Sequence, residues 1–119
     1  MDEELTRLSM ILLRDIVRIA ALPGYLQIES FPSQVVAADE IALDFDTHCM
    51  WALEGLGAPA LTKEQEASLI ALDARLDRMS NEHNPSLWTD DALRHHPEWD
   101  DVRADARRIL DAFGWSIDS

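Results

Sequence analysis

Two stretches of the chain combine histidine with carboxylate residues, which are the residue types that bind metal ions. His95 and His96 are followed by Glu98 and Asp100, and imidazole and carboxylate groups are common zinc ligands. Adjacent side chains point in different directions, however, and the sequence contains neither an HExxH motif nor two histidines spaced by four residues. We therefore expect capping or surface roles for these residues.

Asp44, Asp46 and His48 form the second group, in which the residues are spaced by two. On a helix this spacing spreads the side chains around the axis, and only Asp44 and His48, which are four residues apart, share a face. Two groups on one face are too few for a metal centre. The sequence predicts no metal site.

Nucleophilic catalysis would require a cysteine or serine beside a base. His48 and Cys49 are neighbours on a predicted helix, so their side chains diverge by about 100°, and we expect Cys49 to be inert core. The chain has no nucleophile elbow, phosphate-binding glycine-rich loop or dinucleotide fingerprint. Close carboxylate pairs carry no specific signal in a chain with 23 acidic residues. We expect no enzymatic activity, no catalytic residue and no cofactor.

The charge balance limits the classes of partner. The chain has 119 residues, with 10 Lys and Arg against 23 Asp and Glu, and a formal net charge of −13. Nucleic-acid backbones and anionic membrane surfaces repel such a domain, whereas a basic protein attracts it. We expect a basic protein partner, and neither nucleic acid nor membrane. The alternative is that the acidity only keeps the protein in solution.

The acidic residues are concentrated in one segment. Residues 25–61 contain no lysine or arginine, and their acidic residues are Glu29, Asp39, Glu40, Asp44, Asp46 and Glu54. On a helix, Asp39 and Glu40 neighbour Asp44 along one side, where like charges destabilise an isolated helix by about 0.2–0.5 kcal/mol per pair. A basic partner would relieve that repulsion; a merely solvated face is the alternative.

Tryptophan is frequent in this chain, with residues at Trp51, Trp88, Trp99 and Trp115. Trp51 and Trp99 lie among apolar neighbours, and we expect core packing for both. Trp88 precedes Asp90 and Asp91 after a Pro-Ser loop, and an exposed aromatic beside carboxylates is typical of protein interfaces, with core packing as the alternative. We expect Trp115 to fold back over the core.

Helical periodicity is the main structural signal in the first half of the chain. A first helix from about Asp2 to Leu22 is predicted to bury a stripe of Leu5, Leu8, Leu12, Ile16 and Ile19, which Ile11 and Leu13 widen. Residues 25–30 indicate an extended loop or a helical turn. A second helix opens at 31–33 and runs to Leu53 or Leu56, where Gly55 and Gly57 end it. Its predicted inward stripe is Val36, Leu43, Met50 and Leu53, with Ile41, Phe45 or Cys49 on its flanks.

Capping signals define the helices of the second half. Thr62 and Gln65 form a capping-box pattern that starts a third helix, with Leu69, Leu72, Leu76 and Met79 as its buried stripe. Thr89 precedes a short helix, and Pro97 starts a last helix that Gly114 ends. Its predicted apolar face is Trp99, Val102, Ala106, Ile109, Leu110 and Phe113. We therefore expect an all-α protein with a single helical domain over residues 1–119, a compact bundle of four main helices plus a short helix.

Location in the cell is predicted from what the sequence lacks. No apolar run reaches the roughly 20 residues of a membrane span, and the acidic start Met1-Asp2-Glu3-Glu4 is unlike a signal peptide. Cys49 has no second cysteine with which to form an intramolecular disulfide. We expect a cytoplasmic protein.

In size, acidity and helical make-up, the whole chain resembles the small acidic immunity proteins of bacterial contact-dependent growth inhibition and related polymorphic toxin systems. The stretches that carry the resemblance are 61–65 (LTKEQ), 72–80, 87–93 (LWTDDAL), 97–99 (PEW) and 102–103 (VR). The resemblance implies a protein that binds its cognate toxin tightly as a heterodimer and performs no chemistry. Many such toxins are nucleases with a basic, phosphate-binding cleft.

The residues that we expect to bind the partner are the acidic residues of the second helix, the exposed tryptophan and the carboxylates beside it. They are Asp39, Glu40, Asp44, Asp46, Glu54, Trp88, Asp90 and Asp91. An adaptor or regulatory domain for another basic protein is the alternative function. A small enzyme or metal protein that uses His95 and His96 is the third.

Overall fold

The computed structural model describes residues 3–54 and 61–117, and over these ranges it contains helices and no strand. The elements are α1 (Glu3–Ala21), α2 (Gly24–Glu29), α3 (Ala37–Leu53), α4 (Lys63–Asn81), the 3-10 turn η1 (Pro85–Leu87), α5 (Asp90–His95) and α6 (Pro97–Phe113). The expected all-α fold with four main helices is confirmed, with two short helices in addition to them. In the described part of the chain, no helix is long and apolar enough to cross a membrane.

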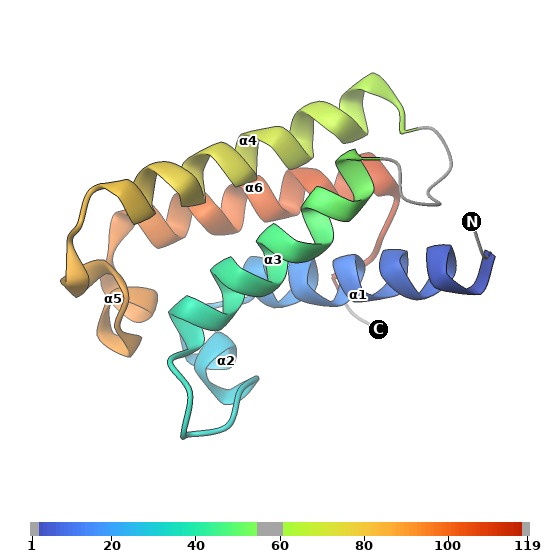
Figure 1. The fold of residues 1–119 in the computed structure, drawn as a ribbon. Helices are drawn as coiled ribbons and strands as arrows, with labels where there is room; N and C mark the ends of the chain where they lie inside the picture. The colour runs from blue at the N-terminus through green and yellow to red at the C-terminus, as the bar shows by residue number, and fades with distance from the viewer. Residues whose placement is uncertain (1–2, 55–60, 118–119) are drawn as a thin grey trace.

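The four long helices form a closed bundle. α1 packs on α6, α6 on α4, α4 on α3 and α3 back on α1 (Figure 1). The two short helices, α2 and α5, pack on each other at the end of the bundle where α3 begins (Figure 1). The core therefore fills the space between four helices, and each long helix must bury the side that faces its two neighbours.

The buried face of α1 differs from the predicted one. Ile16 and Leu13 are buried as expected, but the other buried residues of α1 are Ser9, Val17, Ala20 and Ala21. The predicted residues Leu5, Leu8 and Leu12 are exposed, and Ile19 is half-buried. The N-terminal half of this helix is apolar on more than one side, so its sequence offers two candidate stripes. The packing against both α3 and α6 selects one of them.

The predicted start of α3 is wrong, and the core lies on the predicted flank of the stripe, where Ile41, Phe45 and Cys49 are buried, rather than on the stripe itself. The helix begins at Ala37, because residues 32–35 form a turn in which the Val35 amide donates to the Pro32 carbonyl at 3.2 Å. Its buried residues are Ala37, Ala38, Ile41, Phe45, Cys49 and Ala52. Val36, Leu43 and Met50 are exposed and Leu53 is half-buried. The alanines allow α3 to approach its neighbours closely, which turns Leu43 and Met50 to the opposite side.

The helix boundaries of the second half follow the predicted capping signals. The Thr62 hydroxyl accepts from the Gln65 amide at 3.0 Å, and the Gln65 side chain accepts from the Thr62 amide at 3.0 Å. The predicted stripe of α4 is buried, and α6 begins at Pro97 and ends at Gly114, whose φ is 68°. Gly55 and Gly57, which were expected to end the second helix, lie outside the described residues.

A buried polar cluster fastens the two short helices to the bundle. Gln27, in the stretch predicted as a loop or helical turn, is fully buried in α2 and donates to the Ile19 and Ala20 carbonyls at the end of α1. Arg103 of α6 donates to the Gln27 side chain at 3.0 Å and to the Leu93 carbonyl of α5 at 3.1 Å. These bonds satisfy carbonyls that a helix end leaves open.

Candidate functional site

A solvent-facing groove runs between α3 and α4. Three adjoining hollows share lining residues: Ala42, Leu43 and Ser80 join two of them, and Asp46 and Asp73 join the third. The groove therefore extends from Trp88 and Asp39 at one end to Met50 and Glu54 at the other. Phe45, Leu76 and Cys49 line its base.

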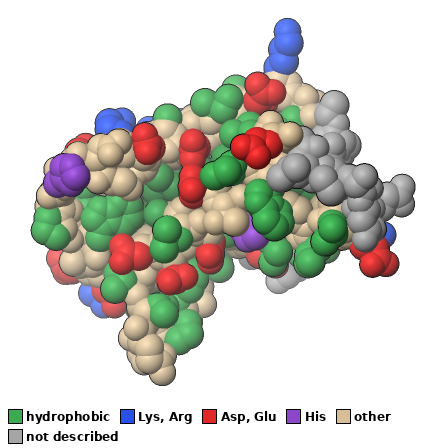
Figure 2. Space-filling model, viewed as in Figure 1, with side chains coloured by type: hydrophobic (Ala, Val, Ile, Leu, Met, Phe, Trp, Pro, Cys, Tyr) green, Lys and Arg blue, Asp and Glu red, His purple; other side chains and the backbone are tan. Residues whose placement is uncertain are grey.

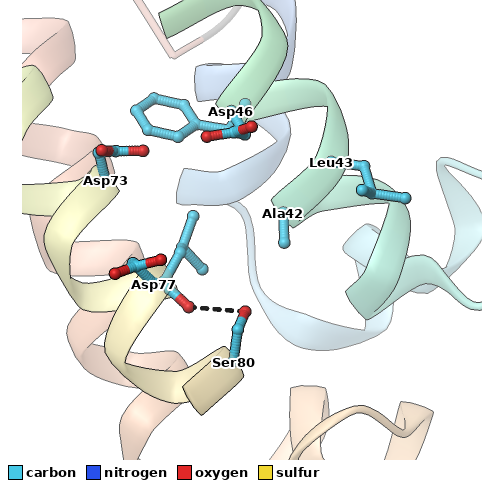
Figure 3. Close-up of a pocket in the computed structure, with 8 residues that line it drawn as sticks. Ala42, Leu43, Asp46, Asp73, Asp77 and Ser80 are labelled. Carbon is cyan, nitrogen blue, oxygen red and sulfur yellow. Dashed lines mark hydrogen bonds between the residues drawn. The ribbon is translucent and has the colours of Figure 1, made fainter. Parts of the chain in front are cut away.

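Carboxylates line both walls of this groove, which we call the acidic groove. Asp39, Asp46 and Glu54 come from α3 and its last turn, and Asp73 and Asp77 come from α4. Figure 3 shows Asp46 facing Asp73 and Asp77 across the space between the two helices. Among the described residues that line the groove there is no lysine or arginine. The groove is thus a surface of a single charge sign.

The two arginines of α4 are directed to its other side. Arg75 donates to the buried carboxylate of Asp105 on α6 at 2.6 Å, and Arg78 donates to Glu98 on α6 at 3.1 Å. Residues 62–80 are almost neutral in total, but the helix separates their charges by face. Figure 2 shows the result: on the face crossed by α3, acidic and hydrophobic side chains alternate, and the basic side chains lie at its edges.

The electrostatic field in the groove is reflected in the protonation of two groups. Burial raises the pKa of Asp73 above its usual value, and the neighbouring carboxylates of Asp46 and Asp77 raise it further. Burial likewise raises the pKa of the Cys49 thiol to about 12, with Asp73 and Asp46 adding to the effect. A cation placed in the groove would oppose both shifts.

The structure brings together part of the predicted partner-binding set. Asp39, Asp46, Glu54 and Trp88 line the acidic groove. Glu40 and Asp44 lie on the other flank of α3, with Asp44 about 140° around the helix axis from Asp39. We expected Asp39 and Asp44 to lie on one side of the helix. In the structure they lie on different sides. The remaining two residues, Asp90 and Asp91, are exposed in the first turn of α5.

Two residues of the groove, Asp73 and Asp77, were missed by the sequence reasoning. They lie in residues 62–80, where basic and acidic side chains nearly balance. The net charge of this stretch therefore gives no sign of an acidic surface. Their spacing of four residues places them on one face of α4, whereas Arg75 and Arg78 fall on another. A helical projection of residues 62–80 shows that the acidic and basic residues lie on different faces, and the total charge does not.

The tryptophans divide into buried and accessible residues. Trp99 is fully buried, as expected, and its Nε1 donates to the Leu87 carbonyl at 2.8 Å. Trp88 is half-buried, packs edge-on against Trp99 with ring centroids 5.6 Å apart, and lines one end of the groove. Trp115 folds back as expected and stacks on Phe113 at 4.3 Å.

The expectation for Trp51 is wrong. Its side chain is 43% exposed and packs edge-on against His48, with ring centroids 6.0 Å apart. In this part of α3 the core positions are occupied by Cys49 and Ala52. Trp51 lies between them in the sequence and therefore falls outside the core.

The histidines that suggested metal chemistry have another arrangement. His96 is the N-cap of α6, where its Nδ1 accepts from the Glu98 amide at 3.1 Å, and His95 is exposed. Over residues 3–54 and 61–117, no three His, Cys, Asp or Glu side chains converge where a metal ion could bind. The row of carboxylates in the acidic groove is therefore the candidate site.

Comparison of the chain with known protein families, with curated proteins and with solved structures finds no match.

Proposed function

We propose that the protein is an immunity-type inhibitor that binds a basic bacterial toxin domain through the acidic groove. The observation that carries the proposal is the set of carboxylates on both walls, with no described lysine or arginine among the lining residues. A surface of one sign attracts an oppositely charged partner, raises the rate of association and rejects acidic proteins.

The apolar residues beside the carboxylates favour a protein as the partner. Leu43 is 62% exposed and Met50 is 46% exposed, and both line the groove. Trp88 adds an aromatic face at one end. Apolar and aromatic anchors surrounded by charged residues are the usual composition of a protein interface. A simple solvated acidic face would not need the anchors.

A nuclease toxin is the class of partner that agrees both with the charge of this groove and with the resemblance to immunity proteins found in the sequence. Such a toxin carries a cleft that binds phosphates, and a row of carboxylates offers that cleft the same sign of charge. The inhibitor needs no chemistry of its own, since occupying or covering the cleft excludes the nucleic acid. The complex would form in the cytoplasm of the cell that makes both proteins.

The proposal is tested by expressing the protein together with the product of the neighbouring toxin gene. We expect that growth is rescued and that a stable one-to-one complex is recovered. The groove variant Asp39→Lys/Asp46→Lys should bind at least tenfold more weakly and with a flatter dependence on salt concentration. Both outcomes are read from growth curves and from binding titrations at several salt concentrations.

The structure supplies a matched control on the same helix. The variant Glu40→Lys/Asp44→Lys makes the same change in net charge on the other flank of α3, and we expect its affinity to change less than threefold. Circular dichroism of both variants checks that they fold. No rescue and no complex with the wild-type protein, or equal losses in the two variants, would contradict the proposal.

A further inference from the structure

We propose that the acidic groove receives an amphipathic, cationic α-helix of the partner, lying along α3 and α4. This inference rests on the proposed function, because it assumes that the groove is the surface that meets the partner. It adds the conformation and the residue pattern of the bound segment.

The groove favours a helix over an extended segment because of the way its walls satisfy their hydrogen bonds. Both walls are long helices, α3 and α4, whose interior N–H and C=O groups are already paired within each helix. An extended peptide binds by pairing its backbone with a free strand edge, and two helices present no such edge. A helix brings its own backbone hydrogen bonds and needs only side-chain contacts.

The spacing of residues along α3 supports the same conclusion. Leu43 and Met50 are seven residues apart, as are Asp39 and Asp46. Seven residues are two turns, or about 10.5 Å along a helix, and a helix packed alongside at a small angle presents its own side chains with the same repeat. An apolar residue at every second turn of the partner would therefore meet Leu43 and Met50 in succession.

The two acidic walls define the charge pattern of this helix. Asp46 lies on the α3 side, while Asp73 and Asp77 lie on the α4 side (Figure 3). Asp39 belongs to the α3 side at the Trp88 end of the groove. Leu43 lies beyond Asp46 as seen from α4 (Figure 3), so a bound helix would be complementary if its lysine or arginine residues faced the two acidic walls and its apolar stripe lay along the outer edge of the groove. From Asp39 to Glu54 the α3 wall spans 15 residue steps, which is about 22 Å, or four turns of a bound helix.

Burial of the exposed apolar residues would contribute to the affinity. The bound helix would remove much of the exposed surface of Leu43 and Met50 from water, and each fully buried side chain of this size contributes about 1.5–3 kcal/mol. The carboxylates would set the orientation and the rate of association. Loss of the apolar pair should therefore weaken binding even when every charge is retained.

Two synthetic peptides of identical composition test the inference on the full chain. One has 15 residues of leucine and lysine with leucines at helical spacing, and the other has the same residues with strict leucine–lysine alternation. Isothermal titration gives the affinity, and circular dichroism gives the conformation of the bound peptide. We expect the first peptide to bind at least tenfold more tightly and to become helical on binding.

A pair of variants locates the binding. Leu43→Ser/Met50→Ser should weaken binding of the helical peptide at least tenfold. The control Leu5→Ser/Leu8→Ser removes two leucines of α1 that are 57% and 51% exposed, and it should leave the affinity within twofold. Equal affinity for the two peptides, or equal effects of the two variants, would overturn the helical mode. Loss of toxin neutralisation is measured separately, so a negative peptide result and a negative toxin result remain distinguishable.

Discussion

At the scale of single residues, Cys49 illustrates how the groove alters chemistry beneath it. The thiol lies at the base of the groove, 1% exposed, and its pKa is about 12. At pH 8 only about one molecule in ten thousand then carries the reactive thiolate. We predict that a disulfide reagent such as dithionitrobenzoate leaves the folded protein unmodified for hours at pH 8, and that it reacts within minutes in denaturing urea. Rapid reaction without urea would contradict the buried position of the sulfur.

Asp73 gives the second residue-scale prediction, which concerns stability. Because its pKa is raised in the folded state, the folded protein holds this proton to higher pH than the unfolded chain does. Stability therefore falls as pH rises from about 3.9 through the raised pKa, and the loss persists at neutral pH. Asp73→Asn should raise the free energy of unfolding at pH 7 by up to about 1 kcal/mol, since solvent screens a partly exposed carboxyl.

The pH dependence separates this effect from a general change in packing. In urea unfolding, the gain from Asp73→Asn should disappear near pH 3, where the carboxyl is protonated in both states. Asp111→Asn, an exposed carboxylate on α6, should stay within about 0.5 kcal/mol of the wild-type protein at either pH. A gain for Asp73→Asn that is the same at both pH values would refute the electrostatic explanation.

At the scale of elements, the contact between α2 and α5 depends on one glycine. A Cβ added at Gly24 would collide with the Leu93 carbonyl and would lie 2.9 Å from the Arg94 Cα. These are backbone atoms, so the two helices must move apart. We predict that Gly24→Ala lowers the free energy of unfolding by about 1–3 kcal/mol and accelerates amide hydrogen exchange in both α2 and α5.

Gly114→Ala is the comparison for this prediction. Its added Cβ has no neighbour within 4 Å, but its φ of 68° costs an alanine about 1 kcal/mol. Hydrogen exchange should then change only near the end of α6. Unchanged exchange in α5 of the Gly24→Ala protein would show that the two short helices are not coupled.

Element boundaries and element faces differed in how well the sequence predicted them. The start of α4 was predictable because the capping box of Thr62 and Gln65 is a local interaction within one turn. The buried face of α3 was not, because Leu43 and Phe45 are equally apolar and lie on different sides of the helix. Only the presence of α1 and α4 decides between them, and those contacts are distant in the sequence.

At the scale of the whole molecule, the net charge of −13 predicted the sign of the partner and could not locate the surface. The location of the acidic surface depends on which side of α4 the arginines face. Arg75 is held by Asp105 and lies within 3.7 Å of both Glu98 and Asp101 on α6, which leaves Asp73 and Asp77 without basic neighbours in the groove lining described here. The acidic groove is thus a product of the α4–α6 contact as much as of the acidic segment in α3.

The packing of α1 on α6 has a consequence for the synthesis of the protein. The Arg18 side chain on α1 donates to the Ser116 carbonyl at 2.7 Å, across 98 residues of chain, and α6 covers the first helix from residue 97 onward. A nascent chain that has not yet released residues 97–113 from the ribosome lacks this cover for Leu13 and Val17. The bundle can close only after residues 97–113 have left the ribosome, and until then the side of α1 that α6 covers stays exposed and open to incorrect contacts.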